Sequence, residues 1–279
     1  MNELALFAGA GGGILGGKLF GWRTVCAVEW EQYPASVLCA RQNDGLLPPF
    51  PIWDDVQTFD GKPWRGIVDV VSGGFPCQDI SAAGKGAGID GERSGMWREM
   101  ARIIYEVRPR FAFVENSPML TSRGLGIVLG DLAAMGFNAR WGVLGAADVG
   151  ANHQRDRIWI VAKWRGQLSH AQHNRIRRWE QQQKSVEKEA RKLAYTKRQR
   201  QQGQGQHEQP IDSAEDCDWE AGGIISGSQT RFNGYWDTEP DVGRVADGVA
   251  ARLDRLKAIG NGQVPLCAAT AWQILSKDI

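Results

Sequence analysis

A short apolar segment that leads directly into a run of glycines is the feature of this sequence that most constrains its fold. Leu4 to Phe7 is followed by Ala8-Gly9-Ala10-Gly11-Gly12-Gly13, and Ile14 to Phe20 can then begin a helix. A strand, a glycine loop and a helix in this order allow a ligand to approach the backbone closely at the electropositive end of the helix. Three of the glycines also match the GxGxxG pattern, which has little specificity alone: Gly11, Gly13 and Gly16.

Further apolar segments alternate with segments of helical periodicity, which predicts an α/β fold built on a parallel sheet. The segments expected as strands are Thr24 to Val28, Ile67 to Val71, Phe111 to Val114, and a pair formed by Ala139 to Leu144 and Arg157 to Ala162. The stretches expected as helices cover residues 94–107, 125–135 and 249–256, with a final helix that reaches about Leu275. Open sheets of this type bind ligands at the carboxyl ends of their strands.

A cysteine follows one of these expected strands. Ile67 to Val71 leads into Gly73-Gly74-Phe75-Pro76-Cys77-Gln78-Asp79-Ile80-Ser81, in which two glycines permit a sharp turn and Pro76 fixes the backbone just before Cys77. A buried structural cysteine is the alternative, because free Cys usually packs as a small hydrophobe. The polar loop around Cys77 favours instead a thiol presented at the edge of the sheet.

Acidic residues follow two other strands. Glu29-Trp30 ends the strand at Thr24 to Val28, where a carboxylate would hold a ribose hydroxyl and an indole could lie on an adenine ring. A helix cap and a core aromatic are the ordinary alternatives for this pair, but together with the glycine loop it favours an adenosine-containing cofactor. Asp54-Asp55-Val56 could offer a carboxylate to an exocyclic amine or form a turn.

Glu115-Asn116 ends the strand expected at Phe111 to Val114, so the carboxylate should lie on the same sheet edge as Cys77 and converge with it on one substrate. The link between the last two strands contains Asn152-His153-Gln154-Arg155-Asp156-Arg157. Its arginines either contact a substrate or form a surface ion pair with Asp156, which would contribute little to stability.

Charge is unevenly distributed, although the net charge of the 279 residues is only +1. Residues 155–208 contain fourteen Lys and Arg against five Asp and Glu, and residues 209–241 contain eight acidic residues against one Arg. A basic stretch of this size suggests a face that meets phosphates, although a solvated surface gives the same pattern. Residues 165–240 show little periodicity but contain Trp179, Trp219 and Trp236, so we expect an inserted module that is at least partly folded.

The five cysteines form no CxxC pair, so neither a metal site nor a disulfide framework is expected. No apolar run approaches the roughly 20 residues of a membrane span, and the N-terminus lacks the charged and apolar regions of a signal peptide. We therefore expect a cytoplasmic protein without membrane contact.

Taken in order, these motifs resemble the cytosine-5 DNA methyltransferase family. The blocks that carry the resemblance are Phe7-Ala8-Gly9-Ala10-Gly11-Gly12, Glu29-Trp30, Asp55-Val56, Gly74-Phe75-Pro76-Cys77-Gln78, Glu115-Asn116, Gln154-Arg155-Asp156-Arg157 and Gly260-Asn261-Gly262. The resemblance implies a seven-stranded, Rossmann-like methyltransferase sheet with helices on both faces. It further implies a catalytic and cofactor-binding domain at residues 1–164, a target-recognition region at 165–244, and a segment at 245–279 that returns to the catalytic domain beside the glycine loop.

The activity implied by the resemblance is methyl transfer from S-adenosylmethionine to carbon 5 of a cytosine in a specific sequence of double-stranded DNA, leaving S-adenosylhomocysteine. Cys77 would add to carbon 6, Glu115 would hydrogen-bond the ring edge at N3, and Arg155 and Arg157 would bind the cytosine carbonyl and a nearby phosphate. The base would first be flipped out of the duplex.

The resemblance also implies a set of cofactor-binding residues. Phe7, Gly9 and Gly11 would line the methionine end of the cofactor, and Glu29 would take the ribose. The remaining contacts would be Trp30 and Val56 on the adenine faces, Asp55 on the adenine amine, and Asn261 and Gly262 closing the site. Four positions depart from the family pattern. Ala5 stands where Asp is frequent, Ser117 where Val usually follows Glu-Asn, His153 where Gln often precedes the arginine block, and Gly262 where Ser is common.

Other functions fit part of the pattern. A transfer RNA cytosine-5 methyltransferase would use the same residues, whereas a catalytically silent DNA-binding relative would not need Cys77 and Glu115. A nicotinamide oxidoreductase would explain the glycine loop but not the Pro-Cys and Gln-Arg-Asp-Arg motifs. We expect a monomer that acts on double-stranded DNA, with an associated restriction endonuclease as a candidate partner.

Overall fold

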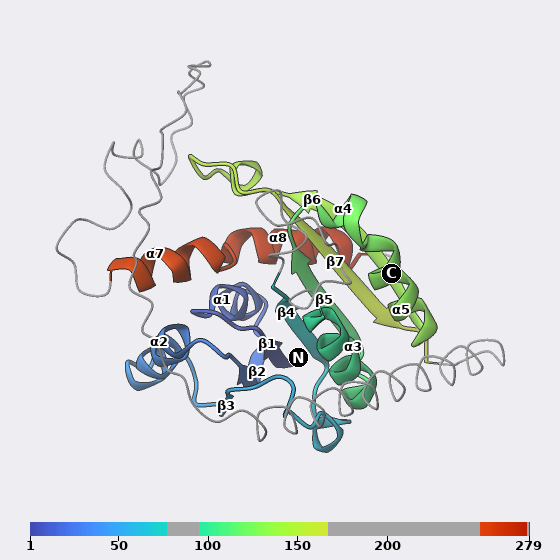
Figure 1. Ribbon diagram of the computed structural model, residues 1–279, viewed down its shortest axis with the longest axis horizontal. Coiled ribbons are helices and arrows are strands. Elements are labelled where there is room, and N and C mark those ends of the chain that lie inside the picture. Colours follow the sequence, from blue (N-terminus) through green and yellow to red (C-terminus); the bar gives the residue numbers. More distant parts are fainter. Residues whose placement is uncertain (77–94, 167–251, 278) are drawn as a thin grey trace, which may run out of the picture. The chain divides into compact units, whose positions relative to one another are not determined.

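Seven strands form a single sheet, drawn in Figure 1 from a computed structural model that describes residues 1–76, 95–166, 252–277 and 279. The strands are β1 (Asn2–Leu6), β2 (Arg23–Val28), β3 (Ile52–Trp53), β4 (Val70–Gly74), β5 (Phe111–Asn116), β6 (Phe137–Leu144) and β7 (Arg157–Trp164). Their order across the sheet is β3-β2-β1-β4-β5-β7-β6. Neighbours from β3 to β5 are parallel, and β7 is antiparallel to both β5 and β6. The predicted parallel sheet and the predicted final strand pair are confirmed.

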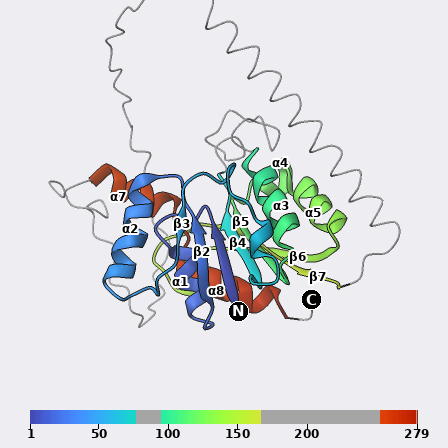
Figure 2. The ribbon, with the colours of Figure 1, turned by 90° about the horizontal axis from the view of Figure 1, so that it is seen from below.

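Helices cover both faces of this sheet. They are α1 (Gly12–Lys18), α2 (Gln32–Asn43), α3 (Met96–Val107), α4 (Leu120–Arg123), α5 (Leu125–Ala134), α7 (Arg252–Asn261) and α8 (Pro265–Leu275), with short 3-10 turns η1 (Lys62–Trp64) and η3 (Ala147–Val149). Helices α1 and α8 lie on one face, and α3 and α5 lie on the other (Figures 1 and 2). The α/β architecture with helices on both faces agrees with the prediction.

The core under α8 is largely aromatic. The Trp272 ring meets Trp22, Phe111 and Phe113 edge to face, with centroid distances of 4.7, 5.1 and 5.5 Å. Such edge-to-face pairs add about 0.5–1.5 kcal/mol beyond the burial of apolar area. They fix the C-terminal helix against the middle of the sheet, next to the N-terminal strand–helix unit.

Helix α3 forms as its sequence predicts. Trp97, Met100, Ile103, Ile104 and Val107 recur at helical spacing, and all five side chains are buried. At its end Arg108 adopts a left-handed conformation (φ 50°), with its N–H donating to the carbonyl of Ile104. The following Pro109 cannot continue a helix, which fits the observed end.

Two sequence-based assignments need correction. The strand expected to start at Ile67 starts at Val70, because the N–H groups of Ile67 and Val68 both bond to the carbonyl of Trp64 and form a turn that leaves the Ile67 side chain 50% exposed. Helix α2 was not predicted. It buries only Leu38, so its sequence has no apolar periodicity to reveal it.

Several predicted features lie outside the described residues. Cys77 is one of them, although the preceding Phe75 and Pro76 are described. Most of the region expected to recognise the target also lies outside, so the predicted boundaries at residues 164 and 244 stay predictions. Within the described ranges, no helix combines the length and hydropathy needed to cross a lipid bilayer.

Candidate functional site

A pocket with about 370 Å³ of empty space, its open mouth included, lies at the carboxyl ends of β1, β4 and β5. Four stretches of the chain line it, namely Ala5–Gly9 with Gly13 and Ile14, Ser72–Gly74, Glu115, and Asn261–Gln263. Five predicted site residues therefore share one pocket: Phe7, Gly9, Glu115, Asn261 and Gly262. The strand that leads to Cys77 also forms part of its wall, through Gly73 and Gly74.

The loop after β1 is shaped by left-handed backbone conformations. Phe7, Gly9 and Gly11 have φ angles of 51°, 55° and 91°, which suit glycine and are uncommon for phenylalanine. The Ala8 N–H donates to the Val28 carbonyl at 3.1 Å, so the loop stays attached to β2. No atom lies within 4 Å of the position that a Cβ of Gly9 would take, which leaves the backbone open to a ligand there.

The glycines at the start of α1 make room for the C-terminal segment, whereas their GxGxxG pattern suggests the approach of a ligand. A Cβ on Gly12 would meet the backbone carbonyl of Gln263, and one on Gly13 would meet the Gln263 side chain. A Cβ on Gly16 would lie 2.8 Å from the Cβ of Ala268. These glycines therefore let α8 and the residues before it approach α1 closely.

Glu115 lies in the pocket with both carboxylate oxygens engaged. Its Oε1 is 2.9 Å from Nε of Arg157, and its Oε2 accepts a hydrogen bond from Nε2 of Gln263 at 3.3 Å. The residue is 8% exposed, and burial raises the pKa of this carboxyl above its ordinary value, although Arg157, Gln263 and Arg155 oppose part of the rise. A carboxyl group in this environment is suited to hold a proton and donate it.

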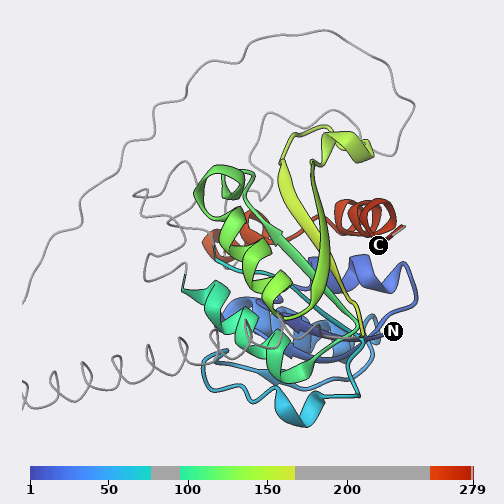
Figure 3. The ribbon, with the colours of Figure 1, turned by 90° about the vertical axis from the view of Figure 1, so that its right-hand side faces the viewer.

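The two predicted arginines have different partners. Register places Arg157 opposite Leu144 and Trp159 opposite Glu115, so the link between β6 and β7 reaches the edge where the parallel strands end (Figure 3). Arg157 contacts Glu115 directly. Arg155, whose φ is 108°, instead donates from Nη2 to the Gly260 carbonyl at 2.6 Å and also to that of Gly262. It thereby neutralises carbonyl groups at the end of α7.

Asn116 supports the backbone that leads to Cys77. It is 2% exposed, and its Nδ2 donates to the carbonyl of Phe75 at 3.0 Å. The Phe75 ring also packs on Trp97 of α3, with centroids 5.5 Å apart. The chain is thus fixed two residues before Cys77 by a buried hydrogen bond and an aromatic contact.

The remaining predicted cofactor residues lie at the ends of β2 and β3. The Glu29 N–H donates to the Trp53 carbonyl at 2.8 Å, which holds the two strand ends together. The Glu29 carboxylate accepts from the N–H groups of Gly9 at 2.6 Å and Glu31 at 2.8 Å, and burial raises its pKa. Trp30 is 72% exposed, so it is not a core aromatic.

Asp55 and Val56 follow β3 on the neighbouring strand end. Asp55 accepts a hydrogen bond from the N–H of Gln57 at 2.9 Å, which makes it the start of a turn, and Val56 is buried. The structure therefore joins Gly9 to Glu29 by a direct bond and places Glu29 beside the strand that leads to Asp55.

Two residues of the site were not assigned roles from the sequence. Gln263 directly follows the Gly260-Asn261-Gly262 motif. This position next to a predicted site motif is the sequence signal that could have identified it as a site residue. Asn116 follows Glu115 and was quoted only as part of the same motif. Neither residue type reveals its hydrogen-bond partner, because each partner is more than 40 residues away in the sequence.

The chain is similar to known methylases. The profile of the family described as C-5 cytosine-specific DNA methylase matches residues 1–230. Type II methyltransferase M.NgoBI of Neisseria gonorrhoeae is 34% identical over 164 residues, which cover 57% of this chain and 50% of that protein. Type II methyltransferase M.CviJI of Paramecium bursaria Chlorella virus IL3A is 31% identical over 163 residues, which cover 58% of this chain and 42% of that protein.

The matched part of this chain thus spans about half the length of these two relatives, or less. A comparison with the crystal structure of the Dnmt2 methyltransferase of S. pombe gives a TM-score of 0.47 at 18% identity, over 61% of this chain and 50% of that one. The family profile covers far more than half of the 279 residues. The chain belongs to the C-5 cytosine-specific DNA methylase family.

Proposed function

We propose that this protein transfers a methyl group from S-adenosylmethionine to carbon 5 of cytosine in DNA. The observation that carries the proposal is the single pocket in which Phe7 and Gly9 of the glycine loop meet Glu115, beside the strand that leads to Cys77. A carboxyl group with a raised pKa and an arginine in contact with it suit addition of a thiol to a pyrimidine ring, and Cys77 follows Gly74 of the pocket wall by three residues in the sequence.

The residues around the pocket fit S-adenosylmethionine. The backbone around Gly9 is open to a ligand, and Glu29 is fixed next to it by the Gly9 N–H. A carboxylate has about four acceptor positions, so Glu29 can accept ribose hydroxyls in addition to its two backbone donors. Trp30 presents its ring to solvent beside this carboxylate, where it can cover one face of adenine. When bound, the cofactor supplies an electrophilic methyl group.

Cys77 carries the covalent step in this proposal. Its thiolate adds to carbon 6 of cytosine, a sulfur–carbon bond forms, and the electron pair of the ring double bond moves to carbon 5 and towards N3. Protonated Glu115 donates to N3 and so stabilises the negative charge that develops there. Once carbon 5 carries the methyl group, a base, which can be water, removes its proton. The electron pair of that bond re-forms the double bond between carbons 5 and 6, and the sulfur–carbon bond breaks to release the Cys77 thiolate.

Arg157 has two tasks in this scheme. It orients Glu115 through the 2.9 Å contact, and its remaining N–H groups can bind the cytosine carbonyl. Arg155 supports the site from behind by holding the Gly260 and Gly262 carbonyls, which keeps Asn261 at the pocket. We therefore propose a supporting role for Arg155, and the direct substrate contact expected from the sequence stays a prediction.

The proposed substrate is a cytosine within double-stranded DNA. The target cytosine lies in double-stranded DNA and is flipped into the pocket, because carbons 5 and 6 cannot be reached within a stacked duplex. Residues 165–244 read the sequence, with residues 1–164 and 245–279 forming the catalytic domain. The enzyme works in the cytoplasm as a monomer, and an endonuclease with the same recognition sequence is its candidate partner.

Base-resolution sequencing of 5-methylcytosine tests the proposal. DNA from a methylation-free bacterial host that produces the full chain should carry the modification in one sequence context, and a Cys77→Ala strain should carry none. Absence of DNA methylation from folded protein that binds S-adenosylmethionine would contradict the DNA substrate. Methylated transfer RNA in the same cells would then identify the competing substrate.

A further inference from the structure

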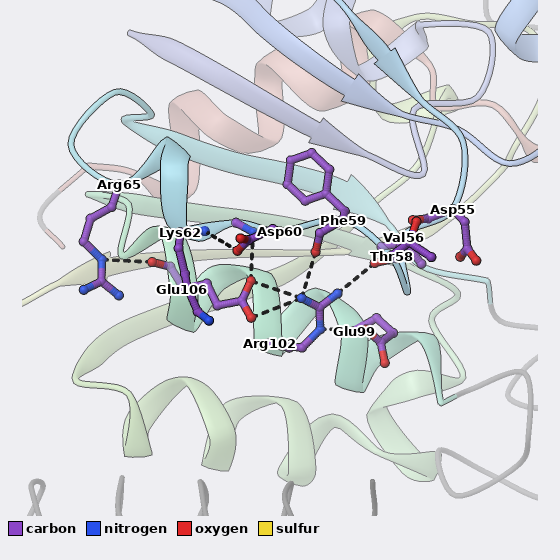
Figure 4. Close-up of polar contacts among 11 residues, drawn as sticks. Asp55, Val56, Thr58, Phe59, Asp60, Lys62, Arg65, Glu99, Arg102 and Glu106 are labelled. Carbon is purple, nitrogen blue, oxygen red and sulfur yellow. Dashed lines mark hydrogen bonds and ion pairs between the residues drawn. The ribbon is translucent and has the colours of Figure 1, made fainter. Parts of the chain in front are cut away.

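A partly buried arginine on α3 binds the backbone of the segment that follows β3. Arg102 donates from Nη2 to the Val56 carbonyl at 2.8 Å and from Nη1 to the Phe59 carbonyl at 2.9 Å (Figure 4). The same guanidinium contacts Oε2 of Glu99 at 2.8 Å through Nε and Oε2 of Glu106 at 3.0 Å through Nη1. One side chain thus joins two backbone carbonyls of this segment to two carboxylates of the helix.

Glu106 adds a second connection between the helix and the segment. Its Oε2 accepts from the Gly61 N–H at 2.9 Å, and its backbone carbonyl accepts from Nε of Arg65 at 2.9 Å (Figure 4). A Cβ on Gly61 would lie 3.0 Å from the Cβ of Glu106, so the chain passes very close to the helix at this point. Residues 56–65 are therefore held along α3 at four backbone or side-chain positions.

This arrangement is specific to arginine. The planar guanidinium spans several acceptors in a fixed geometry, and a lysine ammonium is a point charge that cannot reach all of them at once. A purely structural role would be sufficient if the segment had no function. However, the segment begins with Asp55 and Val56, the two residues assigned to the adenine ring, and the Val56 carbonyl is itself one of the acceptors.

We propose that Arg102 is a positioning residue for recognition of the adenine amine. It fixes the Val56 carbonyl and thereby the adjacent Asp55 carboxylate relative to the end of β2, where Glu29 lies. Recognition of a single amine depends on placing its acceptor to within about 0.5 Å, so a loosened segment would lose selectivity before it lost its overall fold. This inference rests on the proposed function, because it uses the assignment of Asp55 to adenine.

The experiment compares two cofactor products that differ at one group. S-adenosylhomocysteine carries the exocyclic amine, and S-inosylhomocysteine carries an oxygen in its place. Isothermal titration should show that the full-length protein prefers the adenosine compound by at least about tenfold, because the Asp55 carboxylate accepts from the amine and repels the oxygen. Asp55→Asn should remove most of this preference.

Arg102→Lys should reduce the preference severalfold and weaken binding of S-adenosylhomocysteine about tenfold, measured well below its thermal unfolding transition. In the Arg102→Lys, Asp55→Asn double variant the two effects should not add, because both act on the same contact. Arg108→Lys is the matched control. It is the same chemical change on an exposed residue at the end of α3, and it should leave both affinities unchanged.

The outcomes distinguish a failure of the proposed cofactor placement from a failure of the positioning role of Arg102. If the unaltered protein binds S-adenosylhomocysteine without preferring it, or does not bind it, the cofactor placement under the proposed function is wrong. If it shows the preference and folded Arg102→Lys retains it in full, Arg102 has a structural role alone and this inference is overturned. Should Arg102→Lys fail to fold, Glu106→Gln decides: it loosens the segment at Gly61, and an unchanged preference in that variant would overturn the inference as well.

Discussion

The carboxylate of Glu115 and the guanidinium of Arg157 lie 2.9 Å apart at the point where the last parallel strand meets its antiparallel neighbour. Glu115 is the last residue but one of β5 and Arg157 is the first residue of β7, so the register of a single strand pair fixes their contact. The pairing gives the acid a partner that opposes part of the rise in its pKa.

Removal of Arg157 should change the pH dependence of the reaction. In the proposed mechanism the reaction requires protonated Glu115, so the rate should fall as pH rises through its raised pKa. Because Arg157 lowers that pKa, Arg157→Leu should move the descending limb of the pH–rate profile to higher pH and reduce the maximal rate by about 10²-fold. Single-turnover rates between pH 6 and 10 provide the measurement. Arg140→Leu, on an exposed residue of β6, is the control, and a limb that stays in place would refute the role given to Glu115.

Asn116 should matter for the rate more than for cofactor affinity. Asn116→Ala removes the hydrogen bond to the Phe75 carbonyl and loosens the backbone before Cys77. We expect kcat to fall about tenfold to a hundredfold, since small displacements of a nucleophile have effects of this order. Titration with S-adenosylhomocysteine should give an unchanged Kd. A weakened Kd with a normal kcat would assign Asn116 to the cofactor instead.

Gly13→Ala should destabilise the protein through Gln263. The new Cβ would meet Oε1 of Gln263, and overpacking of this kind costs about 1–3 kcal/mol. Gln263→Ala should restore most of the lost free energy of unfolding, because it removes the atoms that clash. Gly126→Ala on α5 is the matched control: nothing lies within 4 Å of its Cβ position, so a stabilisation of about 0.5–1 kcal/mol is expected. Urea unfolding is measured for the unaltered protein, the two single variants, their double variant and the control, and strictly additive effects of the pair would exclude a direct clash.

Glu3 should make stability fall with rising pH. It is 1% exposed, the hydroxyls of Thr24 and Ser72 donate to its carboxyl oxygens, and burial raises its pKa. Since the folded pKa lies above the ordinary value of 4.5, the stability that Glu3 contributes is fully present below pH 4.5. It is lost as pH rises through the folded pKa. Glu3→Gln should remove it. The free energy of unfolding of Glu3→Gln minus that of the unaltered protein should therefore increase from pH 4.5 upward, and a constant difference would disprove this.

The described cysteines should differ in reactivity. Burial raises the pKa of Cys26 and Cys267 to about 11, and Cys39 is exposed. At pH 8 a thiol with that pKa is about one part in a thousand thiolate, which slows alkylation strongly. Mass spectrometry after a short iodoacetamide pulse on Cys77→Ala protein should find Cys39 modified and the two buried thiols intact. Rapid modification of Cys267 would show that α8 separates readily from the sheet.

Local patterns predicted much of the fold. Each strand is a short apolar run followed by glycine or polar residues, so the sheet edge and the residues on it were predicted from neighbours in the sequence. The glycine loop and Glu115 were placed at this edge on this basis, whereas Phe7, Asn261 and Gly262 were assigned to the site through the family resemblance. Phe7, Gly9, Glu115, Asn261 and Gly262 line one pocket. The predicted chemistry of Cys77 stays a prediction.

Contacts between distant segments were not predictable. The sequence around Arg102 reads as an ordinary amphipathic helix, and its bonds to the Val56 and Phe59 carbonyls depend on how a loop is laid along that helix. Arg155 was expected to face the substrate, but the carbonyls it binds belong to a segment about 105 residues later. Helix α2 was missed for a related reason, since a helix that buries Leu38 alone carries no periodic signal.

Residues 261–263 form a wall of the pocket and face the loop at residues 7–13, although the two segments lie far apart in the sequence. This distance along the chain has a consequence for how the pocket could be assembled. A polypeptide that has folded only through residue 166 possesses the sheet but lacks one side of its pocket. The C-terminal helices could therefore be supplied as a separate peptide, held to the sheet by the Trp272 contacts and by the glycine surface of α1. The pocket would then be complete only when the two pieces are brought together, so its assembly could be controlled by whatever joins them.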